Sequence, residues 1–384
     1  MNNDVLTAFS IFQLTFFLLD IFILSKTDRG IVTKGEYDGF CALICSHLSY
    51  LVLNSLWTLM EYDVLKLPRP AAILICTLSL WMVTNCAFFF FLFVVEKLQL
   101  KVLKTGAGKW LRLLPAAFST LMIVTTPWTG LVFRLDEAAY FIHGPMYLAT
   151  LAAASLYLLA VAAVACINML REKTRFQRKA NAVLLASVML IILCILIDGT
   201  LSKASILPAA VFTVITWIFI TMQEANINSD ALTGMNNRRK AEDYLTDKVK
   251  GVSDKKPFFL YIGDLNNFKK INDTCGHAVG DEALVLCSRA LKRTIGQYGG
   301  FAARYGGDEF LLSWQPDKGG EADPERLIQD INTFLGELSK DKPYQLAMTM
   351  GYVLCTNPKE PLISYIRQAD GMLYRRKKAA RVGR

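Results

Sequence analysis

The sequence predicts a multidomain chain, in which an all-α bundle of about seven transmembrane helices precedes an α+β domain. Two features of the composition lead to this prediction. Of the 384 residues, 53% are hydrophobic and only 20% are charged, which is typical of membrane-embedded sequence. Long apolar runs dominate the chain up to about residue 222, and charged residues, glycine and proline return at ordinary density afterwards. We therefore expect a membrane domain at 1–222, a short helical junction at 223–229 and a cytoplasmic domain at 230–384.

Seven stretches of the first part are long enough, at about 17–25 residues, to cross a bilayer as helices. Proline interrupts or begins the fourth and the seventh of them (Pro115, Pro127 and Pro208). The N-terminal stretch has no basic residues in front of it, so we interpret it as a retained span and not a signal peptide. The predicted spans are 5–25, 39–60, 71–95, 111–133, 146–170, 180–199 and 206–222.

Basic residues in the connecting loops predict the orientation. One set of alternate loops holds thirteen, and the opposite set holds only four (Lys66, Arg69, Arg134 and Lys203). Loops rich in Lys and Arg stay in the cytoplasm. We therefore expect a multi-pass protein of the cytoplasmic membrane with its N-terminus outside and its second part inside. The thirteen are Lys26, Arg29, Lys34, Lys97, Lys101, Lys104, Lys109, Arg112, Arg171, Lys173, Arg175, Arg178 and Lys179.

The same charge distribution argues against nucleic acid as a partner, because much of the net charge of +9 lies in these loops. Nine cysteines and three histidines form no C-x-x-C or other metal-ligand spacing, which disfavours a zinc site and a disulfide framework.

Two ionisable residues inside the predicted spans, Asp20 and His47, lie at depths that would let them meet. Ionisable groups within spans are functional candidates, but a hydrogen bond that holds two helices together is the simpler interpretation. The short outer loop at 134–144 leaves no room for a separate sensory domain. Any signal would thus be a small or lipidic molecule, whose identity the sequence does not give.

The junction, Gln223 to Ser229, contains neither glycine nor proline. The last span could therefore continue as one helix and transmit a rotation or a shift to the second part.

The second part alternates helical and β patterns. Helices are expected near 236–250, 266–274, 279–296, 324–339 and 361–379, and β segments near 258–262, 301–305, 309–314 and 344–355. The residues Gly306-Gly307-Asp308 between the second and third β segments indicate a hairpin turn. This order predicts an α+β sheet covered by helices.

Carboxylates mark the ends of two of these β segments. Asp264 follows the first, and Asp308 and Glu309 lie at the hairpin. Mg²⁺ sites for nucleotides use a few carboxylate oxygens and leave the remaining positions to water and phosphate. Taken singly, Asp264 could equally be a helix N-cap, and Asp308 an ordinary turn residue.

Four motifs that occur together resemble those of the GGDEF family of diguanylate cyclases. They read D-A-L-T-G-M-N-N-R at 230–238, D-L-N-N-F-K-K-I-N-D-T-C-G-H-A-V-G-D at 264–281, R-Y-G-G-D-E-F at 304–310 and A-D-G-M-L-Y-R-R-K-K at 369–378. The resemblance covers about residues 228–384 in the family's order. It implies a cyclase-like fold with a central sheet, and the condensation of two GTP molecules into cyclic di-GMP with release of pyrophosphate.

The resemblance also assigns roles to single residues. It implies that Asp264, Asp308 and Glu309 are catalytic and, with the backbone carbonyl of Leu265, hold magnesium. It assigns the recognition of guanine to Asn272 and Asp281, and contacts with the triphosphate to Lys269, Lys377 and Arg381. A carboxylate suits the N–H donors of guanine, and cationic side chains suit phosphate. The alternative for Lys377 and Arg381 is a solvated basic tail.

Further expectations follow from the family. Because one domain holds one GTP, two domains of a homodimer must face each other, and their alignment would set the rate. Asp230, Gly234, Asn237 and Arg238 match the family's first turn, whose role is structural. The R-x-x-D pattern of a product-inhibition site is replaced by Q-Y-G-G at 297–300, so we expect no inhibitory site.

Two alternatives stand beside a membrane-bound diguanylate cyclase. The first is a non-catalytic GGDEF domain that binds GTP and signals by contact, and the intact acids argue against it. The second is a transporter or receptor with an accessory domain. It would need polar residues along several spans, and these are too few.

Overall fold

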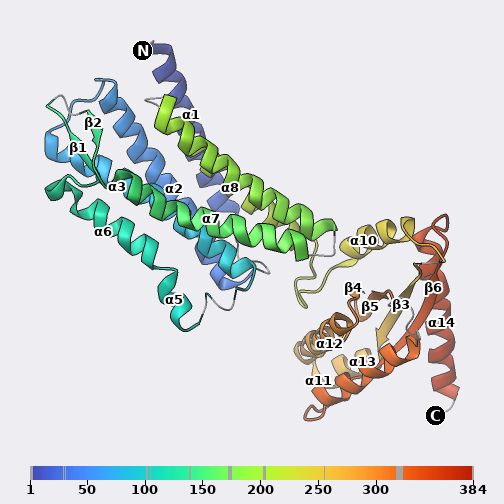
Figure 1. The fold of residues 1–384 in the computed structure, drawn as a ribbon. Coiled ribbons are helices and arrows are strands. Elements are labelled where there is room, and N and C mark those ends of the chain that lie inside the picture. Colours follow the sequence, from blue (N-terminus) through green and yellow to red (C-terminus); the bar gives the residue numbers. More distant parts are fainter. Residues whose placement is uncertain are drawn as a thin grey trace. The chain divides into compact units, whose positions relative to one another are not determined.

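The computed structural model describes residues 3–28, 30, 32–100, 103, 105–137, 140–171, 175–201, 205–254, 256–316 and 323–382. The chain forms two compact units, Met1–Gln223 and Glu224–Arg384 (Figure 1). The first is mainly helical and the second contains a four-stranded sheet.

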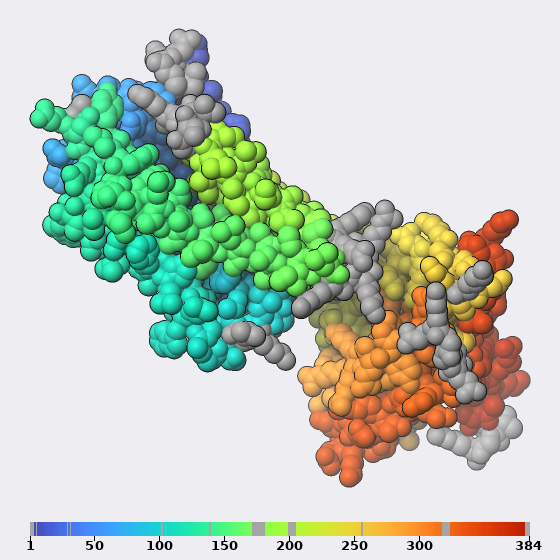
Figure 2. Space-filling view, viewed as in Figure 1, coloured from blue at the N-terminus to red at the C-terminus, as the bar shows by residue number. Residues whose placement is uncertain are grey.

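The first unit consists of long apolar helices and one small hairpin. Its elements are α1 (Asn3–Lys26), α2 (Lys34–Glu61), α3 (Arg69–Lys97), α5 (Ala107–Leu111), α6 (Leu114–Thr129), β1 (Phe133–Leu135), β2 (Phe141–His143), α7 (Tyr147–Arg171), α8 (Arg175–Leu201) and α9 (Leu207–Ile227). Six of the described helices are long and apolar enough to cross a membrane: α1, α2, α3, α7, α8 and α9. On α7, which faces the viewer in Figure 2, Leu148, Leu156, Leu159 and Leu170 are exposed, as lipid-facing positions would be.

The predicted fourth span, 111–133, differs from the other six. Its helix, α6, has 16 residues, ends at Thr129 with Pro127 in its last turn, and is followed by β1. Sixteen residues make a helix of about 24 Å, which is shorter than the roughly 30 Å of a hydrocarbon core. The count of seven spans therefore stays a prediction. So does the outside position of the N-terminus, which depends on an odd count. Five of the basic loop residues lie outside the described residues (Arg29, Lys101, Lys104, Lys173 and Lys203).

Asp20 and His47 meet inside the helical unit. The His47 Nδ1 atom lies 2.6 Å from Asp20 Oδ2, and both side chains are fully buried. The His47 Nε2 atom lies 3.1 Å from the carbonyl oxygen of Pro208, in the first turn of α9. A carbonyl only accepts, so Nε2 must carry a hydrogen. One further proton lies between the carboxylate and Nδ1, and the pair is neutral overall. This contact joins α1, α2 and α9.

The second unit is a sheet between two layers of helices. Its elements are α10 (Arg238–Lys250), β3 (Phe258–Leu265), α11 (Phe268–Cys275), α12 (His277–Gln297), β4 (Phe301–Gly306), β5 (Glu309–Trp314), α13 (Pro324–Leu338), β6 (Met348–Cys355) and α14 (Leu362–Val382). The strand order is β4-β5-β3-β6, and all neighbours are antiparallel. Each predicted helix and strand of this part has a counterpart here.

Alternation along β3 explains the two layers. Phe258, Leu260 and Ile262 face α10 and α14, whereas Phe259 and Tyr261 face α12 and α13. The strand is three residues longer than predicted, because Gly263 does not end it. A Cβ atom at Gly263 would lie 2.5 Å from the Met348 sulfur, so glycine lets β3 and β6 pack closely there. Asp264 therefore lies within β3, one residue before its end.

Candidate active site

The three predicted acids come together at one end of the sheet. In the register of β3 and β5, Asp264 lies directly opposite Glu309. Asp308 lies in the turn of the β4–β5 hairpin, where Gly307 adopts a φ of +41° that favours glycine. The Leu265 amide donates a hydrogen bond to the Asp308 carbonyl (3.1 Å). In this arrangement Asp264 and Glu309 form a pair without mutual backbone hydrogen bonds, in which the Cα atoms are about 4.5 Å apart.

Burial and repulsion from neighbouring carboxylates raise the pKa of two of these acids, Asp308 and Glu309. Burial, followed by the negative charge of Asp264, raises the pKa of Asp308 above its usual value. Burial, with the charges of Asp264 and Asp308, raises the pKa of Glu309 in the same direction. Two acids with raised pKa values next to a third carboxyl group form a place where a cation is stabilised.

A lysine supplies part of that positive charge. Lys377, on α14, places its Nζ atom 2.6 Å from Asp264 Oδ1, and both side chains are at least two-thirds buried. The sequence places Lys377 among contacts to phosphate, and the structure pairs it with the first of the acids. Helix α14 packs on β6 and β3, and this packing brings a residue 113 positions away to Asp264.

The donor set suits magnesium better than a transition metal. Across the described ranges, no three His, Cys, Asp or Glu side chains form a ready metal cage. Mg²⁺ does not need one, because it is usually held by one or two carboxylates and takes its other ligands from water and substrate phosphate. Asp264, Asp308 and the backbone of Leu265 at the end of β3 fit that requirement.

The residues assigned to guanine lie on α11 and α12. Asn272 is half-buried on α11, and its amide packs against the backbone of Gly280, where a Cβ atom would be 1.8 Å from Asn272 Oδ1. Asp281 follows Gly280 and is exposed. Lys269 is exposed on α11, and the Arg381 side chain lies outside the described residues.

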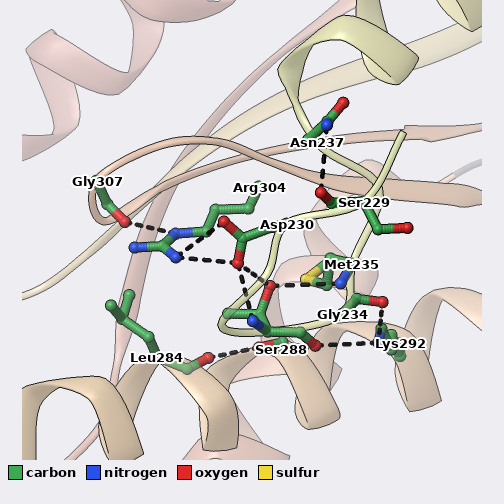
Figure 3. A network of polar contacts seen from close by, with 11 residues as sticks. Ser229, Asp230, Gly234, Met235, Asn237, Leu284, Ser288, Lys292, Arg304 and Gly307 are labelled. Atoms are coloured by element: carbon green, nitrogen blue, oxygen red, sulfur yellow. Dashed lines mark hydrogen bonds and ion pairs between the residues drawn. The ribbon is translucent and has the colours of Figure 1, made fainter. Parts of the chain in front are cut away.

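The motif residues without an assigned chemical role form a network behind the hairpin (Figure 3). The Arg304 guanidinium lies 3.0 and 3.1 Å from the two oxygens of Asp230, and its Nε atom donates to the Gly307 carbonyl (2.8 Å). Asp230 also accepts from the amide and the hydroxyl of Thr233. Sequence reasoning assigns no role to Arg304, although it begins the motif R-Y-G-G-D-E-F. Its contact with Asp230, 74 residues earlier, is a tertiary one.

Comparison with known proteins finds matches to the second unit. Residues 227–382 match the family described as diguanylate cyclase, GGDEF domain. The probable diguanylate cyclase DgcC of Escherichia coli strain K12 is 34% identical over 159 residues, which are 40% of this chain and 41% of that protein. The cyclic di-GMP phosphodiesterase PdeR of the same strain is 29% identical over 163 residues, 40% of this chain and 23% of that protein.

Among solved structures, the coiled coil and GGDEF domain of DgcB from Caulobacter crescentus, in complex with c-di-GMP, is similar to 44% of this chain. The match covers 89% of that chain, with 21% identity and a TM-score of 0.38. The chain spans less than half the length of the curated relatives named above.

Proposed function

We propose that this protein, whose C-terminal unit is a GGDEF domain, is a membrane-bound diguanylate cyclase that condenses two GTP molecules into cyclic di-GMP and pyrophosphate. The observation that supports it best is the register that sets Asp264 opposite Glu309 and beside Asp308, with the Lys377 ammonium against them. A domain that only bound GTP would have no need for three mutually repelling acids at one point.

In this proposal each residue of the site has a separate task. Asp264, Asp308 and the Leu265 carbonyl would hold magnesium, with Glu309 beside them. The ion, when bound, would neutralise the triphosphate and make the attacking 3′-hydroxyl more acidic. Lys377 would exchange its contact with Asp264 for one with a phosphate oxygen, and Lys269 and Arg381 would add charge-assisted bonds to the same group.

The base of GTP would be recognised on the other side of the site. Asp281 would accept from guanine N–H groups, and the Asn272 amide, held against Gly280, would complete the contact. Each domain binds one GTP, so the 3′-hydroxyl of one nucleotide meets the α-phosphorus of the other only in a homodimer. The two half-sites must be aligned for in-line attack, and this alignment governs the rate.

The helical unit would control that alignment from the bilayer. Six described helices are apolar and long enough to span it. Helix α9 continues to Ile227, beyond Gln223, and no glycine or proline follows Pro208 within it. A signal that shifts α9 would therefore be passed on by a continuous helix.

The product assay tests the proposal directly. Full-length protein, purified in detergent and supplied with GTP and Mg²⁺, should form cyclic di-GMP that mass spectrometry detects. Asp308→Ala should lower the rate at least about a hundred-fold, because a charge at the reacting phosphate is lost. Asp247→Ala is the matched control, since Asp247 is exposed on α10, and it should leave the rate unchanged.

Two other results would change the conclusion. GTP turnover without a cyclic dinucleotide would indicate a different nucleotide chemistry. GTP binding without any turnover, under all conditions, would favour the contact-signalling module.

A further inference from the structure

A hollow of about 340 Å³ lies at one end of the helical unit. It is bordered by the start of α3, the end of α6 and strand β1, and among its lining residues are Arg69, Ile73, Trp128, Thr129, Phe133 and Arg134. At the other end of α3, Lys97 donates to Thr221 of α9. Arg69 and Lys97 are the first and last residues of α3 and are about 42 Å apart. The hollow is therefore at the end opposite to the one where α9 leaves the unit.

Two guanidinium groups line this hollow without carboxylate partners. Arg69 donates from Nη2 to the Leu135 carbonyl (2.8 Å), and Arg134 from Nε to the Gly130 carbonyl (3.4 Å). Within the described ranges, neither is within 4.0 Å of an acid. A hydrogen bond to a neutral carbonyl does not neutralise the guanidinium charge, and each guanidinium has five N–H donors. Both arginines are exposed, so an anion can reach them from the solvent.

The nearby acids are engaged elsewhere. Glu61 accepts from the Trp57 indole (3.3 Å) and from the Phe141 amide (3.1 Å). Asp63 accepts from the Tyr140 hydroxyl (2.9 Å). These contacts fasten the β1–β2 hairpin to the end of α2, and neither Glu61 nor Asp63 is within 4.0 Å of Arg69 or Arg134.

Two arginines at one hollow are also unexpected for this part of the chain. The loops of this side hold only four basic residues, and two of them line one hollow. Apolar side chains form part of the wall, and the Trp128 side chain is 83% exposed next to them. Such a wall suits the hydrocarbon or ring portion of a ligand whose charged end meets the arginines.

We propose that Arg69 and Arg134 form a binding site for an oxyanion, a carboxylate or phosphate group, and that this site receives the ligand of the helical unit. Arginine binds both groups through paired N–H donors. The group could belong to a small soluble acid or to the headgroup of a phospholipid. Either ligand would tie the start of α3 to β1 and to the end of α6. The site does not depend on cyclase activity, and binding alone tests it.

The experiment uses the full chain in an uncharged detergent at constant ionic strength. Inorganic phosphate, acetate and short-chain phosphatidylglycerol are titrated separately, with an uncharged glycolipid of the same chain length as the lipid control. The readouts are the midpoint of thermal unfolding and tryptophan emission, to which Trp128 contributes. The variants are Arg69→Gln and Arg134→Gln. Lys66→Gln serves as the control, because Lys66 is an exposed base of the same loop outside the hollow.

At least one probe should give a saturable shift. The affinity measured from it should fall about ten-fold or more in Arg69→Gln and in Arg134→Gln, and should change less than two-fold in Lys66→Gln. A shift with phosphatidylglycerol alone would identify a lipid headgroup, and one with phosphate or acetate alone a soluble acid. No saturable shift with any probe, or an equal loss in Lys66→Gln, would overturn the proposal. If a glutamine variant does not fold by circular dichroism, Arg134→Lys replaces it, and unchanged affinity in that variant would contradict paired N–H recognition.

Discussion

At the scale of single residues, Arg304 connects the turn that precedes α10 with the hairpin that carries Asp308. Its guanidinium bonds Asp230 on one side and the Gly307 carbonyl on the other. Burial works against ionisation of Asp230, but hydrogen bonds from Thr233 and Arg304 outweigh it and lower the pKa of Asp230. The carboxylate is therefore charged at neutral pH and holds Arg304 in place.

Arg304→Ala should destabilise the GGDEF domain and slow the reaction. Removal of a charged hydrogen-bond partner costs about 1.5–3 kcal/mol, and a loosened hairpin should lower kcat about ten-fold or more through misplacement of Asp308. Thermal unfolding and the cyclic di-GMP assay measure the two effects. Arg289→Ala, at an exposed position of α12, should change neither. A normal kcat in Arg304→Ala would mean that the hairpin is held by other contacts.

Lys248 gives a second prediction at this scale. Its ammonium lies 4.8 Å from the centre of the Phe258 ring and donates to the Ser313 hydroxyl (3.2 Å). Burial lowers the pKa of Lys248 to about 8. Between pH 8 and about 10.4 the unfolded chain keeps a proton that the folded chain has lost, so stability rises with pH in this window.

Lys248→Met should therefore be more stable than the wild type at pH 7, by about 1–3 kcal/mol. The difference should shrink as the pH rises from 8 to 10.4. Chemical unfolding of both proteins across this range measures it. Lys250→Met, which removes an exposed lysine paired with Asp247, should show no such trend. A constant difference between Lys248→Met and wild type would contradict the lowered pKa.

At the scale of elements, the turn between α11 and α12 sets the position of Asn272, which the proposed function assigns to guanine. Gly276 has a φ of +86° and separates the helices, and Gly280 lets α12 approach the Asn272 amide. The position of Asn272 depends on the absence of a side chain at 280.

Gly280→Ala should displace Asn272 and weaken GTP binding, because the added methyl group would lie 1.8 Å from Oδ1. We expect KM for GTP to rise about ten-fold or more, in keeping with the loss of a polar contact. Steady-state kinetics measure it. Gly296→Ala is a matched control on the same helix, because a Cβ atom there meets nothing within 4 Å, and its KM should stay the same. An unchanged KM in Gly280→Ala would show that Asn272 does not take part in guanine recognition.

Element boundaries show what the sequence could and could not predict. Periodicity and the Gly-Gly-Asp turn predicted β4 and β5 well, because local residues determine a hairpin. The end of β3 was misjudged because Gly263 is usually read as a strand breaker, and only its tertiary contact with Met348 explains its place in a strand. Hydropathy alone did not reveal that α6 ends at Thr129 and a hairpin follows. In the site, motifs predicted the acids, but the pairs Lys377–Asp264 and Arg304–Asp230 depend on three-dimensional packing.

At the scale of the whole molecule, the proposed function divides signal input and product formation between the two units. The segment 297–300, which lacks an R-x-x-D pattern, is used here for packing. Tyr298 donates to Asp330 and its ring lies 5.3 Å from that of Trp314, and Gly299 turns the chain toward β4 with a φ of +62°.

We therefore expect the proposed cyclase activity to be insensitive to its own product. Cyclic di-GMP added to the assay should lower the initial rate less than two-fold, because no Arg and Asp are present at 297–300 to bind it. Initial rates at increasing product concentration measure this. A saturable loss of the initial rate of more than two-fold would contradict the expectation.

The contact of His47 with Pro208 links the two ends of the helical unit's sequence, 161 residues apart. A chain shortened to begin at α2 would leave His47 without its Asp20 partner, and the imidazole would lose its fixed orientation. The carbonyl at the start of α9 would then lack a partner in an apolar interior. N-terminal deletions, although distant in sequence from the acids of the candidate site, would thus act on α9, the helix in which the chain passes from the first unit to the second.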